Sequence, residues 1–176
     1  MIRLYLKTAI LAMAIITVSF SVQAQKAGGT LVYLVQPEPP TLASYVSTSG
    51  PIGLVAPKIY EGLFDYDNDL NIIPVLAETY TVSKDGKTVT FNLRKGVTWH
   101  DGKPFTSADV KFTVLQVLKK VHPRGPNSFR EVYRIDTPDA HTAVFKLNNP
   151  APYMLRSFAA YESPIVPKHL LEGKEI

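Results

Sequence analysis

The sequence predicts an α/β fold with mixed strand pairing. Thr88–Leu93 alternates apolar and polar residues with the period of a half-buried strand. Ser107–Lys120 carries apolar residues at the spacing of an amphipathic helix. Strand-like and helix-like segments follow one another without the regular spacing of βαβ units, so a purely parallel sheet is not expected.

The first predicted strand is Thr30–Val35, a β-branched and aromatic run suited to burial. The prolines of Gln36–Pro40 end it, because proline cannot donate a ladder hydrogen bond. Thr41–Ser49 is polar and is expected to form a loop. A short helix should begin at Pro51, with Gly62 as its stop.

The segment before the central helix predicts a strand end followed by a hairpin. Phe64–Leu70 is typical of a strand that runs into an acidic turn. The hairpin should extend from Tyr80 to Leu93 and turn at Asp85–Gly86. Glycine adopts positive φ without a Cβ clash, and aspartate can bond its own backbone.

The helix at Ser107–Lys120 is the clearest predicted element. Thr106 precedes Asp109 by three residues, which predicts a variant of the capping box. Pro123 forbids continuation of the helix. The core-facing stripe with its flanking residues is Val110, Phe112, Val114, Leu115, Val117, Leu118 and Val121. The solvent-facing residues are expected to be Asp109, Thr113, Gln116 and Lys120.

A second hairpin should follow the central helix. It pairs Glu131–Ile135 with Thr142–Leu147, and its turn is placed at Asp136–Asp139, where a proline presets φ. A short helix from Pro152 to Phe158 and a last helical turn at His169–Leu171 complete the predicted elements.

Residues 1–24 have the pattern of a secretory signal peptide. Arg3 and Lys7 form a basic start, Ala9–Phe20 is apolar, and a small residue, Ala24, precedes the expected cleavage point. The apolar core of about 12 residues is shorter than the roughly 20 that a spanning helix needs, which favours cleavage over an uncleaved membrane anchor. The chain has no cysteine, so the exported protein is expected to carry neither a lipid anchor on cysteine nor a disulfide.

The composition of residues 25–176 excludes one partner class. Arg3 and Lys7 belong to the leader, which leaves 17 basic residues against 15 acidic ones. The basic residues are scattered, so no nucleic-acid partner is expected. A chain of this length buries about 68–70% of its unfolded surface, enough for one domain with its own core.

The string Ala77–Val110 contains the first hairpin, two turn dipeptides and the helix start. It resembles the signature of the solute-binding proteins of ABC importers for oligopeptides, dipeptides and nickel, known as solute-binding protein family 5. Further segments that resemble landmarks of this family, in the same order, are Gly29–Val35, Glu38–Leu42, Ile59–Tyr66, Ile73–Glu78, Val144–Pro152 and Ile165–Leu170. The likeness covers nearly all of the chain after the leader.

The resemblance implies a fold like that of the type II periplasmic binding proteins. Residues 25–50 would supply the first strand of one lobe and a loop on the cleft side. Residues 51–176 would supply most of an inserted, β-rich α/β subdomain that is truncated at its C-terminal end. Complete family members are far longer, so the second lobe is expected to be absent.

The function implied by the resemblance is that of the periplasmic solute-binding component of an ABC importer for peptides. The chain would be an N-terminal fragment that does not bind solute alone. Its partners would be a peptide or another small solute, held together with the missing lobe, and the permease subunits of the transporter. Neither a cofactor nor an enzymatic activity is expected. A secreted structural or interaction domain stays open as the alternative, with a periplasmic hydrolase as a more distant one.

In this family the loop after the first strand borders the cleft between the lobes. The resemblance therefore points to Gln36, Glu38, Ser47, Thr48 and Ser49 as residues that contact solute. The alternative for these five residues is a plain surface loop.

Five aromatic residues allow two interpretations. Tyr60, Tyr66, Tyr80, Phe91 and Trp99 could line a ligand pocket, because such pockets combine aromatic walls with a few polar groups. They could equally belong to the core, where aromatic residues dominate the packing. The strand alternation and the helical phase favour the core for Phe91 and Tyr60.

Catalysis and metal binding are weakly indicated. His100 and Asp101 suggest an acid–base pair that Glu78 or Asp109 could complete, but neighbours on an extended segment point to opposite faces. No serine lies in the context of a nucleophile elbow. The histidines lie 22, 19 and 28 residues apart, which matches no compact metal motif. The residues expected to be solvated loop histidines are His100, His122, His141 and His169.

Overall fold

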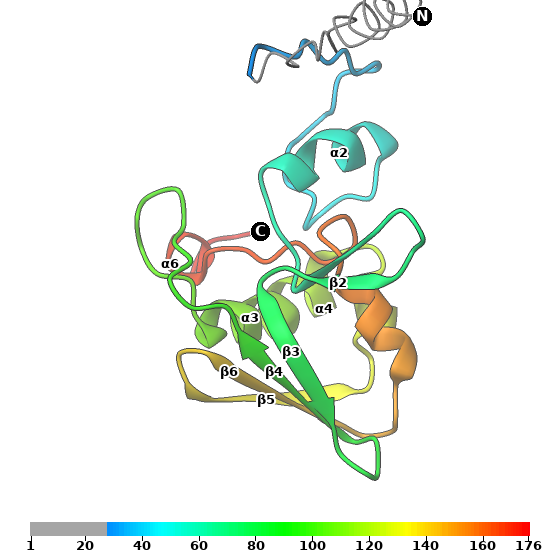
Figure 1. Cartoon of the computed structure of the whole chain (residues 1–176), viewed down its shortest axis with the longest axis vertical. Helices are drawn as coiled ribbons and strands as arrows, with labels where there is room; N and C mark the ends of the chain where they lie inside the picture. The colour runs from blue at the N-terminus through cyan, green and yellow to red at the C-terminus, as the bar shows by residue number, and fades with distance from the viewer. Residues whose placement is uncertain (1–27) are drawn as a thin grey trace, which may run out of the picture. The chain divides into compact units, whose positions relative to one another are not determined.

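The computed structural model describes residues 28–176, and the chain divides into two units, 1–34 and 35–176 (Figure 1). The predicted signal peptide lies outside the described residues. In the first unit, residues 28–34 have no regular secondary structure, and Leu31 and Val32 are 87% and 88% exposed. The prediction of a buried strand at Thr30–Val35 is therefore wrong. A strand needs a ladder partner, and none of the described strands pairs with this segment.

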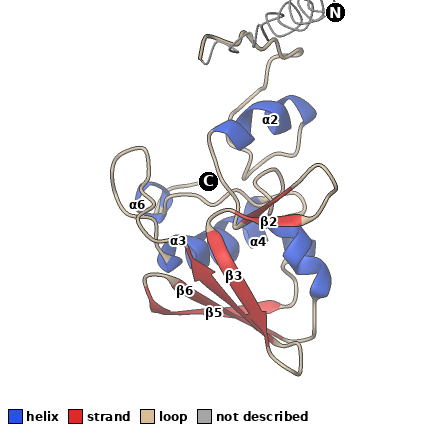
Figure 2. Ribbon diagram, viewed as in Figure 1, coloured by secondary structure: helices blue, strands red, loops and turns tan. Residues whose placement is uncertain are grey.

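The second unit contains two antiparallel sheets (Figure 2). The larger sheet has the strand order β3-β4-β6-β5, and the smaller one pairs β1 with β2. The strands are β1 (Phe64–Tyr66), β2 (Ile72–Pro74), β3 (Ala77–Val82), β4 (Thr88–Leu93), β5 (Val132–Asp139) and β6 (Thr142–Leu147). One isolated parallel bridge joins Phe64 to Ala159.

The first predicted hairpin is confirmed as β3 and β4. Gly86 adopts a φ of 68° in its turn, and the Lys87 N–H donates to Asp85 Oδ1 at 3.0 Å. In β4 the predicted inward residues, Val89, Phe91 and Leu93, are buried. The period-2 pattern therefore assigned the core face of this strand correctly.

The second hairpin is confirmed, but its turn lies elsewhere. β5 continues through Asp139, and the chain reverses at Ala140–His141, where the His141 N–H donates to Asp139 Oδ1 at 2.7 Å. The turn predicted at Asp136–Asp139 is therefore wrong. β5 is an edge strand, and an edge tolerates Pro138, because its missing N–H leaves no interior ladder bond unmade.

The central helix comprises residues 107–121, and its helix type changes from α to π and back to α along its length. It consists of α3 (Ser107–Phe112), a π-helical segment (Thr113–Leu118) and α4 (Lys119–Val121). The predicted capping interaction is present, since the Thr106 N–H donates to Asp109 Oδ2 at 2.8 Å. Figures 1 and 2 show α3 and α4 beside the four-stranded sheet, and α3 contacts β5 and β6.

Two residues assigned to the solvent face of this helix, Asp109 and Thr113, are buried. The helix packs between two apolar clusters, so the buried part of its surface is wider than the single apolar face that the sequence predicts. Val114 and Leu118 join the main core, whereas Phe112 and Val117 join a smaller cluster with Val166, Tyr45, Tyr60, Val121 and Leu171. Gln116 and Lys120 are exposed, as predicted.

The remaining helices are short. They are α2 (Gly50–Val55), a 3₁₀ turn (Ala56–Lys58), α5 (Gly125–Ser128), a 3₁₀ helix (Pro152–Phe158) and α6 (Lys168–Leu171). Gly62 does not stop a helix, because the helical turn ends at Lys58. A Cβ on Gly62 would lie 2.1 Å from the Phe158 carbonyl oxygen, so glycine here permits two backbone segments to approach closely.

Aromatic rings fill the centre of the main core. Phe91 lies 4.9 Å from Phe145 and 5.1 Å from Phe158, measured between ring centroids, and both contacts are edge-to-face. The prediction that Phe91 belongs to the core is confirmed. Over residues 28–176, no helix combines the length and apolarity that crossing a membrane would require.

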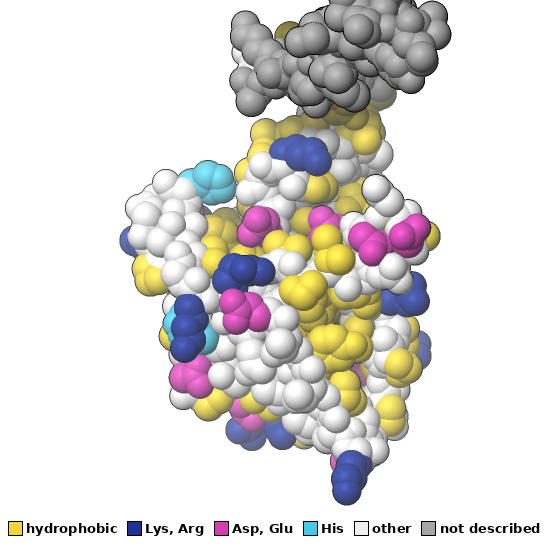
Figure 3. All heavy atoms as spheres, viewed as in Figure 1, with side chains coloured by type: hydrophobic (Ala, Val, Ile, Leu, Met, Phe, Trp, Pro, Cys, Tyr) yellow, Lys and Arg dark blue, Asp and Glu magenta, His cyan; other side chains and the backbone are white. Residues whose placement is uncertain are grey.

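Some apolar side chains remain on the surface of the second unit. Ile73 on β2 and Tyr80 and Val82 on β3 are each about 40–50% exposed. Figure 3 shows apolar side chains gathered over β2 and β3 on the face it presents. β3 is also an edge of the larger sheet, so its outer backbone groups are not paired within that sheet.

Candidate functional site

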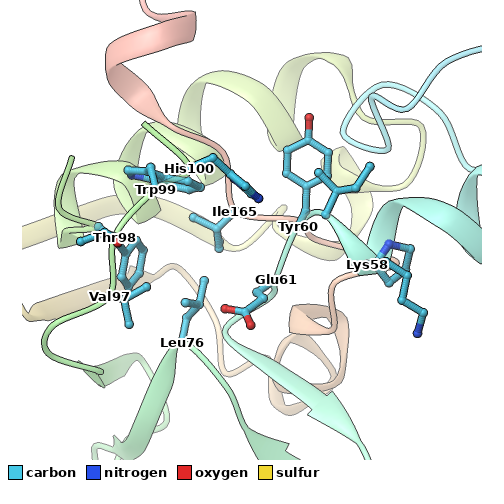
Figure 4. A pocket seen from close by; sticks show the side chains of 12 residues that line it. Lys58, Tyr60, Glu61, Leu76, Val97, Thr98, Trp99, His100 and Ile165 are labelled. Atoms are coloured by element: carbon cyan, nitrogen blue, oxygen red, sulfur yellow. The ribbon is translucent and has the colours of Figure 1, made fainter. Parts of the chain in front are cut away.

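A cavity of about 310 Å³ is the candidate site (Figure 4). One wall is formed by residues 57–61, which follow α2, and the opposite wall by residues 97–100, which follow β4. Leu76, Phe105 and Ile165 supply apolar surface between them. The two walls come from distant parts of the sequence, so only folding brings them together.

A compact turn shapes the wall that follows β4. The Trp99 N–H donates to the Lys103 carbonyl at 2.8 Å, and the Gly102 N–H donates to the Trp99 carbonyl at 2.9 Å. Gly102 has a φ of 82°, which glycine adopts without strain. Asp101–Gly102 is the second of the two turn dipeptides in the string Ala77–Val110, and it forms a turn as expected. This turn holds Trp99 at the cavity.

The other wall is fixed by backbone contacts and one aromatic pair. The Ile165 N–H donates to the Glu61 carbonyl at 2.9 Å, which joins this wall to the chain near the C-terminal end. Tyr60 packs edge-to-face on Tyr45 with ring centroids 6.1 Å apart. Burial, and then the neighbouring Tyr45, raises the pKa of the Tyr60 phenol. Tyr60 therefore lies between the cavity and the small apolar cluster that contains Tyr45.

The charged side chains of Glu61 and Lys58 line the cavity but point in different directions relative to it. Figure 4 shows the Glu61 carboxylate pointing into the cavity on the side of Leu76, whereas the Lys58 ammonium points away. Within residues 28–176 the Glu61 carboxylate takes part in no ion pair. The inward-facing charge is therefore negative.

Asp101 does not pair with His100. Its Oδ2 lies 2.7 Å from the Nε2 of His169 on α6, and this hydrogen bond lowers the pKa of the Asp101 carboxyl. The contact ties the loop that carries Trp99 to α6. His169 thus lies on α6 and is hydrogen-bonded to Asp101, so the prediction of a loop histidine is wrong for this residue. Because the two residues lie 68 positions apart, no local motif could have revealed the pair.

His122 also departs from the prediction, because it is 1% exposed. Its Nδ1 accepts the N–H groups of Gly125 at 3.0 Å and of Arg124 at 3.3 Å, which caps the turn after α4. Burial, and then the positive charge of Arg124, lowers the pKa of the imidazole. His122 therefore has a structural role in its neutral form.

The five solute-contact residues predicted from the family do not line this cavity. Gln36 and Glu38 are exposed. The other three are half-buried: Ser47 Oγ accepts the Ser49 N–H at 3.3 Å, and the Tyr161 hydroxyl donates to the Thr48 carbonyl at 3.2 Å. Their contact with solute stays a prediction.

The five aromatic candidates divide between cavity and packing. Tyr60 and Trp99 line the cavity, so the pocket interpretation fits these two. Phe91 is in the core, and Tyr80 packs against Phe64 with ring centroids 5.5 Å apart. The Tyr66 hydroxyl donates to the Arg156 carbonyl at 2.5 Å. As for metals, no group of three or more potential side-chain ligands occurs in the part of the chain that the structure describes.

The chain matches one protein family and several curated proteins. The family model for bacterial extracellular solute-binding proteins, family 5 Middle, matches residues 71–175, more than half of the chain. The glutathione-binding protein GsiB of Salmonella choleraesuis is 34% identical over 125 residues, which cover 69% of this chain and 24% of that protein. A putative ABC transporter peptide-binding protein of Brucella ovis is 38% identical over 114 residues, or 64% of this chain and 21% of that protein. The chain thus spans about a quarter of the length of these relatives.

Solved structures give the same result. The binding protein AgaA of Agrobacterium tumefaciens R10, in complex with agropinic acid, is 40% identical with a TM-score of 0.67, over 76% of this chain and 27% of that one. AppA of Bacillus subtilis, in complex with a nonapeptide, is 27% identical with a TM-score of 0.69, over 78% of this chain and 27% of that one. NikZ of Campylobacter jejuni, in complex with Ni(L-His), is 27% identical with a TM-score of 0.67, over 80% and 28%.

Proposed function

The chain belongs to the bacterial extracellular solute-binding proteins of family 5, and from this premise we propose that it is the N-terminal part of the peptide-capturing component of an ABC importer. The family match over residues 71–175 is the observation that carries the proposal. The predicted fold class, an α/β fold of the type II periplasmic binding proteins, is confirmed by the solved structures over about three quarters of the chain.

Peptides are the solute class that the relatives favour. GsiB is named for glutathione, the Brucella relative for peptides, and AppA was solved with a nonapeptide. AgaA and NikZ were solved with agropinic acid and Ni(L-His), so a likeness in fold alone does not fix the solute. The peptide assignment therefore needs a direct binding test.

The proposed location is the periplasm. The basic, apolar and small-residue order of positions 1–24 supports export, and the family name describes extracellular proteins. Its proposed protein partners are the permease subunits of the importer. The matched relatives are solute-binding proteins and not enzymes, which supports a function without catalysis.

Two parts of the chain are proposed to meet the solute. The first is the 310 Å³ cavity, because it combines aromatic walls with a few polar groups. The second is the loop with Gln36, Glu38 and residues 47–49, whose support is the position of the corresponding loop in the family. We propose that further parts of the complete protein enclose the ligand, because the chain spans about a quarter of the length of the matched relatives.

We therefore predict that the isolated chain binds no di- or oligopeptide with a Kd below the millimolar range. On an open surface a net hydrogen bond contributes only about 0.5–1.5 kcal/mol. Two or three of them do not offset an association cost of roughly 4–15 kcal/mol. Titration calorimetry of the chain with a peptide library measures this directly. Micromolar binding to the chain alone would contradict the prediction.

The positive arm of the test joins the chain to the remaining length of a family 5 relative. Micromolar peptide binding by the joined protein is the expected result. A second candidate function, a secreted interaction domain, has support in the exposed apolar surface of Ile73, Tyr80 and Val82. Failure of the well-folded joined protein to bind any peptide would favour that alternative.

A further inference from the structure

We infer that the 310 Å³ cavity binds an organic cation with an apolar body, with Glu61 as the counter-ion. The cavity itself carries the inference. It rests on the proposed function in one respect, namely that the cation would be the amino group of a peptide with an apolar first residue.

The charge of the ligand follows from the directions of the ionised groups. The Glu61 carboxylate points into the cavity, and no cation among residues 28–176 neutralises it there. The nearest lysine of the lining, Lys58, points away in Figure 4. An anionic ligand would meet like charge at Glu61, whereas an ammonium group would meet opposite charge.

The body of the ligand follows from the remaining surface. Ile59 is 37% exposed and Val97 and Trp99 are half-buried, so these lining residues leave apolar atoms accessible to a ligand. Trp99 stands at one side with its ring edge-to-face to Phe105, the centroids being 6.1 Å apart. A small inorganic cation would leave this surface wet, but an aliphatic group would cover it and gain the free energy of apolar burial.

The His100 ring can orient such a ligand through a hydrogen bond. Figure 4 shows this ring at the same side of the cavity as Tyr60, whose hydroxyl points away from Glu61 and Leu76. A nitrogen of the His100 ring suits the amide that follows an ammonium group in a peptide as a hydrogen-bond partner.

The test compares two probes that differ in one charge. L-Leucinamide carries an ammonium group and an isobutyl side chain, and N-acetyl-L-leucinamide has the same body without the charge. Trp99 is the only tryptophan of the chain and lines the cavity, so its fluorescence emission reports occupancy. We expect half-saturation by L-leucinamide in the millimolar range. The acetylated probe should need a concentration about two- to fivefold higher, because an exposed ion pair contributes a difference in affinity of about this size.

Two variants assign the preference to Glu61. Glu61→Gln should abolish the difference between the probes, and Glu61→Lys should favour the anion N-acetyl-L-leucine over L-leucinamide. Glu78→Gln is the matched control, because Glu78 is an exposed carboxylate on β3 that does not line the cavity. It should keep the wild-type preference. Glu61 is itself exposed, so its variants should fold, and circular dichroism verifies this.

Two results would overturn the inference: equal half-saturation of the wild-type chain by both probes, or an unchanged preference in Glu61→Gln. The joined protein separates this failure from failure of the proposed function. If it binds peptides and prefers free over N-acetylated ones independently of Glu61, the cavity inference fails alone. If it binds no peptide while the cavity still prefers the cation, the proposed function fails alone.

Discussion

At the scale of single residues, His122 shows how a polar group can serve the core. Its Nδ1 accepts two backbone N–H groups at the turn after α4, which only the neutral ring can do. Protonation would convert this acceptor into a donor and add a positive charge beside Arg124. Both effects disfavour the charged form in the folded state, in agreement with the lowered pKa.

The chain should therefore lose stability as the pH falls below about 6.5, the ordinary pKa of histidine. The unfolded state takes up a proton at His122 before the folded state does, so the free energy of unfolding decreases through this window. Urea melts between pH 5 and 8 measure the slope. His122→Asn should flatten it, whereas His100→Asn, at an exposed position, should not. Equal slopes in the wild type and His122→Asn would contradict this account.

Asp109 connects two elements through one carboxylate. Its Oδ2 accepts the Thr106 N–H at 2.8 Å, and its Oδ1 accepts the Lys168 N–H at 2.9 Å. The residue thus caps α3 and also fixes the start of α6. The spacing to Thr106 made the cap predictable, but the bond to Lys168 spans 59 positions and has no local signal.

Asp109→Ala should lower the free energy of unfolding by about 1–3 kcal/mol, because it leaves two partly buried backbone donors, at Thr106 and Lys168, without their acceptor. The control Asp69→Ala, on the exposed turn between β1 and β2, should stay within about 0.5 kcal/mol. Chemical denaturation of both variants supplies the comparison. A loss at Asp109 no larger than at Asp69 would show that the two hydrogen bonds contribute little.

At the scale of elements, predictions succeeded where the cause is local. The alternation in β4, the turn at Asp85–Gly86 and the cap of α3 depend on a few consecutive residues. The turn at Asp136–Asp139 was misplaced, because the position of β5 at the sheet edge decides whether Pro138 can lie in a strand. Thr30–Val35 has strand propensity but no partner strand in the described part of the chain.

The central helix illustrates the same limit. A stripe with a period of 3.6 residues gives one buried face, yet this helix is buried on two, and its middle is π-helical. Leu115, expected to face the core, is only half-buried, whereas Leu118 is fully buried. The additional buried surface depends on Val166, a residue far along the chain.

Leu118→Ala should therefore cost about 2–5 kcal/mol of stability, as deletion of a fully buried leucine side chain does. Leu115→Ala should cost less, because its side chain already contacts solvent in the folded state. Lys111→Ala, at an exposed position of the same helix, should stay within about 0.5 kcal/mol. Urea melts of the three variants rank the positions, and an equal loss at 115 and 118 would refute the assignment of the two faces.

At the scale of the whole molecule, the family could be predicted from one contiguous sequence segment, whereas the cavity could not be predicted from the sequence. The string Ala77–Val110 is contiguous, so its likeness to family 5 could be seen without structure. The cavity needs Tyr60 and Glu61 beside Trp99, and the folded backbone alone brings them together. For this reason the sequence could name Tyr60 and Trp99 as pocket candidates, although it favoured the core for Tyr60, and it left Glu61 out.

Export is the prediction that concerns the entire chain. We expect cleavage between Ala24 and Gln25, because the apolar core of the leader is too short to span a membrane. Intact-mass measurement of the protein in a periplasmic fraction should give the mass of residues 25–176. Recovery of the complete chain in the membrane fraction would rule out cleavage.

The strand order of the larger sheet also bears on how fast this sheet can form. β3 with β4 and β5 with β6 are local hairpins that close short loops, whereas β4 and β6 pair residues such as Thr88 and Lys146, 58 positions apart. The long connection between these strands contains the central helix. It must close, at a cost in chain entropy, before the contact between the Phe91 and Phe145 rings can stabilise the sheet. The seam between β4 and β6, and neither hairpin alone, therefore carries the largest loop-closure entropy of the sheet and limits its folding rate.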